Sequence, residues 1–352
     1  MHRAVSMTED QKTDKQVKKI TDFFRIRRII IPVLIGLGVA AYLLYRNFDR
    51  DAFMQIEWTG QSYLAIALSL CLMVVRDLAY IVRIRVLTDG QLSWRQSFQV
   101  IMLWEFASAV TPSIIGGTAV ALFILSREGI SMGRTTAIVF VTAMLDELFY
   151  ILMVPLMILI VGPTDLFTSE GSYVLFNTRL GTQGLFALGY LFLLILTLII
   201  LYGIFINPRG FKLLLLHIFR LPILRKWRGR AADTGNEIII TSAEMRGKPW
   251  IFWFKAFAAT FFSWTARFWV VNALIMAFVG LSMSEHFLIY ARQLMMWVLL
   301  LVSPTPGGSG VAELVFGGFL GEFIPNGLTP AMGLLWRTIS YYPYLFIGAI
   351  VL

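Results

Sequence analysis

Long apolar stretches recur along this chain and limit what it can fold into. The stretches at about 62–82, 135–161, 185–205 and 251–279 approach or exceed the roughly 20 residues that a helix needs to cross a bilayer. Only 14% of the 352 residues are charged, whereas soluble domains contain about 25%. The sequence therefore predicts an all-α, polytopic integral membrane protein, because helices satisfy their own backbone polar groups inside lipid.

Lysine and arginine residues predict which side of the membrane is cytoplasmic. Residues 1–28 form a basic segment before the apolar stretch at about 29–45, so the N-terminus is predicted to be cytoplasmic. The longest polar stretch, 206–250, is also basic and is expected on the same side. The net charge of +9 then arises from segments that lie near anionic lipid head groups, and nucleic acid is not expected as a partner. Residues 29–352 are predicted to form a single transmembrane domain.

Two similar breaks interrupt the apolar stretches. One runs from Trp104 to Thr118 and the other from Trp297 to Ser309, and each contains a Pro after Thr or Ser, then Gly-Gly and a small hydroxyl residue. The first break lies within an apolar stretch, 97–126, that separates two basic loops and is too short for two full spans. A re-entrant helical hairpin is predicted there. The same reasoning predicts a second hairpin at 287–322, which enters the membrane from the opposite side.

The two hairpins indicate an inverted repeat. Repeat one is predicted at about 62–161 and repeat two at about 251–352, with the basic connector 206–250 between them. Paired interruptions at corresponding positions of two halves are typical of secondary transporters. The prediction comprises two hairpins and about six full spans, which are 29–45, 62–82, 135–161, 185–205, 251–279 and 329–352.

Ionisable residues inside the apolar stretches are candidate site residues, because a charge in mid-membrane requires a partner or a polar cavity. One interpretation is a set of ion pairs that only fix helix packing. The other is a polar chamber, in which arginines contact a phosphate head group and acids form ion pairs or carry protons. The arginines are Arg76, Arg267, Arg292 and Arg337, and the acids are Asp77, Glu105, Asp146, Glu147 and Glu313.

The breaks themselves supply a second group of candidates. Proline ends a helix, and the residues after Gly-Gly are expected to begin a half-helix whose free N–H groups favour an anion. The alternative is a close helix–helix contact made by small residues. The substrate-binding candidates in the breaks are Gly116, Gly117, Thr118, Gly307, Gly308 and Ser309.

Residue types that carry most cofactor and enzyme chemistry are sparse. The chain has one Cys and three His, which excludes a Cys/His metal site, and it has no phosphate-binding loop of the P-loop kind. No metal, cofactor or catalytic residue is predicted. A membrane-embedded transferase that moves a sugar or other group from a lipid carrier remains an alternative, because an Asp or Glu could serve as its base.

Several motifs resemble a known family. Pro112-Ser-Ile-Ile-Gly-Gly117, Arg127-Glu-Gly-Ile-Ser131, Asp146 and Pro304-Thr-Pro-Gly-Gly-Ser-Gly-Val-Ala-Glu313 resemble the flippase-like family of the lysylphosphatidylglycerol synthase transmembrane region. The resemblance implies a multi-pass protein of a prokaryotic cytoplasmic (inner) membrane. In the bifunctional members of that family, a domain like this one moves an aminoacylated phospholipid between leaflets. Synthase activity is not implied, because the soluble domain that performs it in bifunctional members has no counterpart in these residues.

Together these observations predict a lipid flippase-like transporter rather than an enzyme. Its substrate is expected to be an anionic or zwitterionic membrane lipid, bound in a polar chamber between the two hairpins. The alternatives are the transferase and an ion-coupled secondary transporter of a small solute. A groove open to lipid favours a lipid substrate, whereas a sealed aqueous vestibule favours a solute.

Overall fold

The computed structural model describes residues 42, 45, 54, 58–110, 113–167, 172–175, 178–221, 224–225, 228–301 and 311–351. Nearly all of these residues are helical, so the all-α class is confirmed in its coarse form. The N-terminal segment 1–28 and the second tip 303–310 lie outside the described residues. The helices are α4 (Gly60–Leu87), α5 (Trp94–Val110), α6 (Ser113–Arg127), α7 (Met132–Val161), α8 (Thr182–Leu201), α9 (Pro208–Ile218), α10 (Arg228–Arg246), α11 (Trp250–Met276), α12 (Met283–Leu301), α13 (Val311–Leu320), α14 (Thr329–Ser340) and α15 (Tyr342–Val351).

Three of the described helices are long and apolar enough to cross a membrane. They are Gly60–Leu87, Arg134–Val161 and Phe186–Ile206, and they coincide with three of the predicted spans. The last of them includes a π-helical turn, Tyr202–Ile206. A small antiparallel hairpin, β1 (Ser172–Leu175) and β2 (Thr178–Gly181), occupies part of the connection between the predicted spans 135–161 and 185–205. Strand structure there is an addition to the all-helical prediction.

The last predicted span, 329–352, is not one continuous helix. It divides into α14 and α15 at Tyr341, whose φ of −131° and ψ of −54° leave the helical region. Pro343 lies two residues after Tyr341 and has no N–H with which to continue the hydrogen-bond ladder. The prediction of a single span was therefore wrong in this respect.

The sequence of α4 explains which face it buries. Its N-terminus is closed by a capping box, in which the Thr59 and Ser62 side chains each accept a hydrogen bond from the other residue's backbone N–H. Exposed and buried residues then alternate every three or four positions, as expected for a helix with one face toward lipid. The exposed stripe includes Leu64, Leu68, Val75, Leu78 and Val82, and the buried stripe includes Ala65, Ser69, Met73, Arg76, Tyr80 and Arg83.

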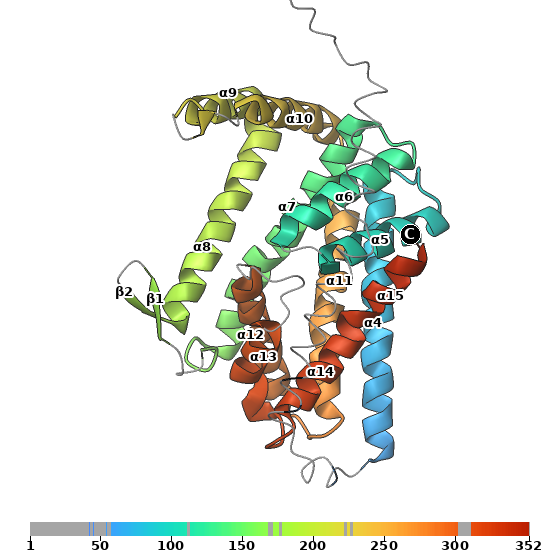
Figure 1. Ribbon diagram of the computed structural model, residues 1–352, viewed down its shortest axis with the longest axis vertical. Helices are drawn as coiled ribbons and strands as arrows, with labels where there is room; N and C mark the ends of the chain where they lie inside the picture. Colours follow the sequence, from blue (N-terminus) through green and yellow to red (C-terminus); the bar gives the residue numbers. More distant parts are fainter. Residues whose placement is uncertain are drawn as a thin grey trace, which may run out of the picture.

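The helices pack around an axis formed by α4 and α11. These two helices share the most extensive contact among the described elements, and the Ser263 hydroxyl of α11 donates to the Arg76 carbonyl oxygen of α4 at 3.0 Å. Helices α5 and α6 pack together beside α4 and α7, whereas α12 and α13 pack together at the opposite end of the molecule (Figure 1). Helix α15 contacts α5, and α12 contacts α7.

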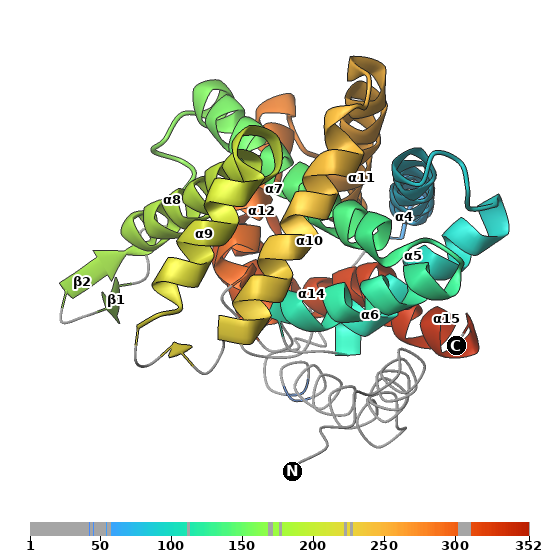
Figure 2. The same cartoon turned by 90° about the horizontal axis from the view of Figure 1, so that it is seen from above.

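Helices α9 and α10 lie across one end of the molecule (Figure 2). They form most of the connector 206–250 and pack against each other, and α10 also packs on α7. We call this end, with the adjoining ends of α4, α7 and α11, the basic end. The name refers to the positive charge of this end, to which Arg209 and Lys212 of α9 and Arg246 of α10 contribute.

Asp89 joins three helices at the basic end. It follows α4 with a φ of 51°, a left-handed conformation that Asp tolerates, and its Oδ2 accepts from Arg134 of α7 and from Lys248, just before α11. Partial burial alone would raise the pKa of the Asp89 carboxyl, but the hydrogen bonds from Lys248 and Arg134 outweigh it and lower the pKa. The carboxylate is therefore ionised at neutral pH, and its contribution to stability is lost only as the pH falls through this lowered pKa.

The contact between α15 and α5 depends on the absence of a side chain at Gly348. A Cβ at this position would overlap the Cβ and ring of Phe106, which is 1% exposed. We expect Gly348→Ala to lower the melting temperature in detergent, because overpacking a core typically costs about 1–3 kcal/mol. The matched control is Gly318→Ala in α13, where no described atom lies within 4 Å of the added Cβ. Equal melting temperatures for the two variants would show that the contact is loose.

Candidate functional site

A cavity of about 490 Å³ lies among α4, α5, α7, α8, α11, α12, α14 and α15. Its volume falls within the range of small-molecule and head-group sites. Apolar side chains from α8, including Phe192 and Leu196, line part of its wall. The polar and aromatic residues of the wall include Tyr80, Arg83, Trp104, Glu105, Ser108, Thr142, Asp146, Glu147, Trp264, Arg267, Gln293, Trp297, Trp336, Arg337, Tyr341 and Tyr344.

Asp146 is held in the cavity wall by two donors from other helices. Its Oδ1 lies 2.5 Å from Arg83 Nη1 of α4 and 2.7 Å from the indole Nε1 of Trp264 on α11. The same Arg83 nitrogen also donates to the Thr260 hydroxyl at 3.2 Å. The charge of Asp146 is thus compensated by a buried partner, and the pair links α4, α7 and α11.

Arg76 forms the centre of a second ion-pair cluster. Its side chain is 1% exposed, and its guanidinium lies 2.6 Å from Glu105 Oε1 and 2.8 Å from Asp77 Oδ1. The Tyr344 hydroxyl accepts from Arg76 at 2.6 Å and lies 2.7 Å from Asp77, to which it donates. The guanidinium also stacks on the rings of Tyr80 and Tyr344. Arg76 does not line the cavity, whereas its partner Glu105 does.

A third ion pair joins α13 and α14. Arg337 Nε of α14 lies 3.2 Å from Glu313 Oε1 of α13. The Arg337 guanidinium also lies 3.8 Å from the centre of the Tyr341 ring, at the break between α14 and α15. Arg337 lines the cavity and is 6% exposed. The pair therefore places a compensated charge at the cavity wall.

Arg267 differs from the other arginines of the cavity. It projects from the middle of α11 into the cavity wall, with its guanidinium 5.2 Å from the centre of the Trp264 ring. Among the described residues, no carboxylate lies within ion-pair distance of it. A half-buried guanidinium without a carboxylate partner favours an anion from outside the chain.

Glu147 is the corresponding exception among the acids. It lines the cavity beside Asp146, and its hydrogen-bond partner in the described part of the chain is the Thr197 hydroxyl of α8, which donates to Oε2 at 2.7 Å. Asp77, Glu105, Asp146 and Glu313 each face an arginine within 3.2 Å. Glu147 therefore has the weakest charge compensation of the five predicted acids.

Arg292 lies in a different environment from the cavity. Its guanidinium donates to the carbonyl oxygens of Asp165 at 2.7 and 2.9 Å and of Phe319 at 2.9 Å, and it pairs with Glu322 at 2.9 Å. These contacts tie α12 to the segment after α7 and to the end of α13. The structure thus places Arg292 outside the group that surrounds the cavity.

The first Gly-Gly pair lies inside a helix rather than before it. Helix α6 begins at Ser113, directly after Pro112, so Gly116 and Gly117 fall within its first turns and Thr118 follows them. The expectation that a half-helix begins after Gly-Gly was wrong here, because proline is well tolerated at the start of a helix and allows one to begin at once. A Cβ at Gly117 would meet the Ser108 side chain of α5, which identifies a close helix–helix contact. Gly307, Gly308 and Ser309 lie outside the described residues.

Two kinds of cavity residue were not predicted from the sequence. The predicted span 62–82 ended just before Arg83, but α4 continues to Leu87 and places Arg83 on the same buried face as Arg76. The spacing of seven residues, two helical turns, was the available indication. The tryptophans Trp104 and Trp297 were used only as markers of the repeat, yet both line the cavity together with Trp264.

Two comparisons with known proteins bear on this cavity. The family model described as "Lysylphosphatidylglycerol synthase TM region" matches residues 29–348. The chain is also 24% identical over 333 residues to a "UPF0104 membrane protein" of Archaeoglobus fulgidus, which covers 91% of this chain and 95% of that protein. The family match includes every cavity residue from Tyr80 to Tyr344.

Proposed function

Because this chain belongs to the lysylphosphatidylglycerol synthase TM region family, we propose that it is a flippase-like transporter that binds an anionic or zwitterionic phospholipid and moves it between leaflets. The head group occupies the cavity between α5, α7, α11 and α12. The acyl chains remain in the surrounding lipid. The basic end faces the cytoplasm of a prokaryotic cell, in accordance with the distribution of Lys and Arg.

The observation that carries this proposal is the environment of Arg267. A guanidinium that faces a cavity and has no carboxylate partner in the described structure is suited to bind a phosphate through two parallel hydrogen bonds. The neighbouring Trp264 ring limits the positions that the guanidinium can adopt. Arg83 and Arg76 are less suited to this role, because each is already paired with an acid.

The packing of the helices supports two related halves. Helix α4 packs on α11, α5 on α15 and α12 on α7, which is the pattern that a two-fold relation between α4–α7 and α11–α15 would produce. The start of α5 and the end of α6 lie together at the basic end, where Gln96 donates to Glu128 at 2.7 Å. The α12–α13 pair lies toward the other end (Figure 1). Two re-entrant hairpins that enter from opposite sides account for both arrangements.

Glu147 is the acid that we assign to proton coupling. An acid that exchanges protons during transport must be free to change its charge, and an arginine partner opposes this change. Glu147 faces only a hydroxyl donor among the described residues, whereas Asp146 beside it is paired with Arg83. A transport rate that does not respond to an imposed pH gradient would argue against this role.

Reconstitution of the full chain in liposomes tests the proposed function. Phosphatidylglycerol, phosphatidylethanolamine and phosphatidylcholine with a fluorescent acyl chain are each followed by dithionite reduction of the label in the outer leaflet. We expect faster exposure of at least the anionic lipid than in liposomes without protein. Equal rates with and without protein for all three lipids would overturn the proposal, and a chemically altered lipid on chromatography would instead identify a transferase.

A further inference from the structure

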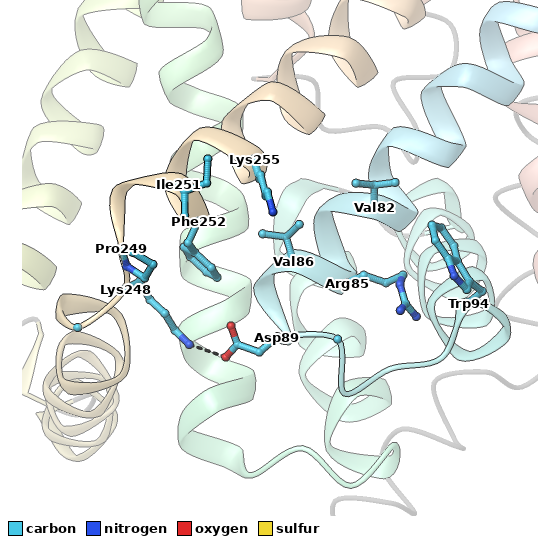
Figure 3. A pocket seen from close by; sticks show the side chains of 12 residues that line it. Val82, Arg85, Val86, Asp89, Trp94, Lys248, Pro249, Ile251, Phe252 and Lys255 are labelled. Carbon is cyan, nitrogen blue, oxygen red and sulfur yellow. Dashed lines mark hydrogen bonds and ion pairs between the residues drawn. The ribbon is translucent and has the colours of Figure 1, made fainter.

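A second hollow lies at the basic end, between the last turns of α4 and the first turns of α11. It has a volume of about 610 Å³ and is open to the outside. Its walls are Val82 and Val86 of α4 and Ile251 and Phe252 of α11, so the two facing helices contribute apolar side chains (Figure 3). It is separate from the central cavity, with which it shares no lining residue.

Two cations of this hollow have no carboxylate partner within the described chain. Lys255 extends from α11 toward Val86, and Arg85 extends from α4 beside Trp94 (Figure 3). The Arg85 guanidinium lies 4.5 Å from the centre of the Trp94 ring and donates to the Leu92 carbonyl oxygen, which leaves other N–H groups free. The remaining cation, Lys248, is already paired with Asp89. The hollow therefore offers two positive charges to an anion.

The hollow continues a surface that faces lipid. Val82 is the last member of the exposed stripe on α4, and Ile251 is exposed on α11. Trp94 is 59% exposed, and tryptophan is enriched at the level of lipid head groups. Arg85 and Lys255 lie close to the basic ends of their helices, where a head group would be found. An acyl chain can thus lie along apolar residues while its phosphate lies in the hollow that both cations line.

We propose that this hollow, the α4–α11 groove, binds an anionic phospholipid of the leaflet at the basic end. Lys255 and Arg85 contact the phosphate, Trp94 lies against the glycerol region, and the stripe that ends at Val82 contacts one acyl chain. The groove is a binding site distinct from the translocation cavity, and its existence does not depend on transport. A soluble phosphate lacks the apolar half of the contacts and binds weakly.

Lipid binding to purified full-length protein tests the groove. Phosphatidylglycerol is added to the protein in detergent, and bound lipid is counted by native mass spectrometry, with phosphatidylcholine and inorganic phosphate as comparison ligands. We expect Arg85→Gln/Lys255→Gln to weaken phosphatidylglycerol binding about 30-fold, because each basic residue near an anionic lipid surface contributes about fivefold. The matched control, Arg209→Gln/Arg220→Gln, removes the same charge from the basic end outside the groove and should leave binding nearly unchanged.

A second measurement does not require the double variant to fold. Phosphatidylglycerol brominated near the ester end of its acyl chains should quench the fluorescence of the parent protein more than that of Trp94→Phe, and phosphatidylcholine brominated at the same position should show a smaller difference. Equal quenching by the two lipids, or an equal loss of binding in the control variant, would overturn the proposal. Strong binding of inorganic phosphate alone would show that the groove takes a free anion rather than a lipid.

Discussion

An Arg267→Gln variant is expected to fold as the parent protein does and to lose most of its lipid translocation. Arg267 has no carboxylate within ion-pair distance in the described structure, and the nearby acid Glu105 keeps its direct pair with Arg76 at 2.6 Å when Arg267 is replaced. Its loss removes charge-assisted hydrogen bonds to the head group, which contribute about 1.5–3 kcal/mol each. We therefore expect at least about tenfold weaker apparent affinity for anionic lipid, measured in the liposome assay, with an unchanged melting temperature.

Two further variants make this expectation specific. Arg267→Lys keeps the charge but lacks the planar fork that binds a phosphate through two bonds, so it should recover only part of the activity. Arg209→Gln removes one positive charge from the exposed surface of α9 and should leave transport intact. A variant at Arg267 that transports normally would remove the main support for a head-group site in the cavity.

The long helices were predictable because their signal is local. The apolar stretches that form α4, α7 and α8 are each long enough for a span, so the existence of these helices followed from the sequence. The division of the last span was not predicted, although Pro343 lies only two residues after Tyr341. Hydropathy continues across that position, so the break is visible only in the backbone conformation.

The charged residues of the candidate site could be predicted from the sequence, but the ion pairs that they form could not. Mid-membrane charges such as Arg76 and Arg267 were recognised from the sequence as one group, because each is equally costly in lipid. The structure separates them: Arg76 is enclosed by two acids, whereas Arg267 faces the cavity. Which acid meets which arginine depends on how α4, α5 and α11 cross, and a single sequence does not specify those contacts. Arg83 was missed for the related reason that the end of α4 was placed too early.

Replacement of Arg76 is expected to lower stability, in contrast to replacement of Arg267. Arg76→Met is expected to lower the free energy of unfolding by about 3–5 kcal/mol, the usual effect of removing one partner from a buried ion pair. The substitution leaves Glu105 and Asp77 without their cation in an environment where Arg76 is 1% exposed. Unfolding in detergent, followed by tryptophan fluorescence, measures the loss.

A second substitution in the same cluster distinguishes packing from head-group contact. If Arg76 serves to neutralise acids, Arg76→Met/Glu105→Gln should be more stable than Arg76→Met alone, because one of the two stranded carboxylates is replaced by a neutral amide of similar shape. Glu105→Gln alone should cost less than Arg76→Met, since Arg76 keeps Asp77 at 2.8 Å. If Arg76 instead contacts the substrate, Arg76→Met would retain stability and lose transport, and the second substitution would restore nothing. The sign of the coupling between these two positions thus decides between the two interpretations that the sequence alone left open for this arginine.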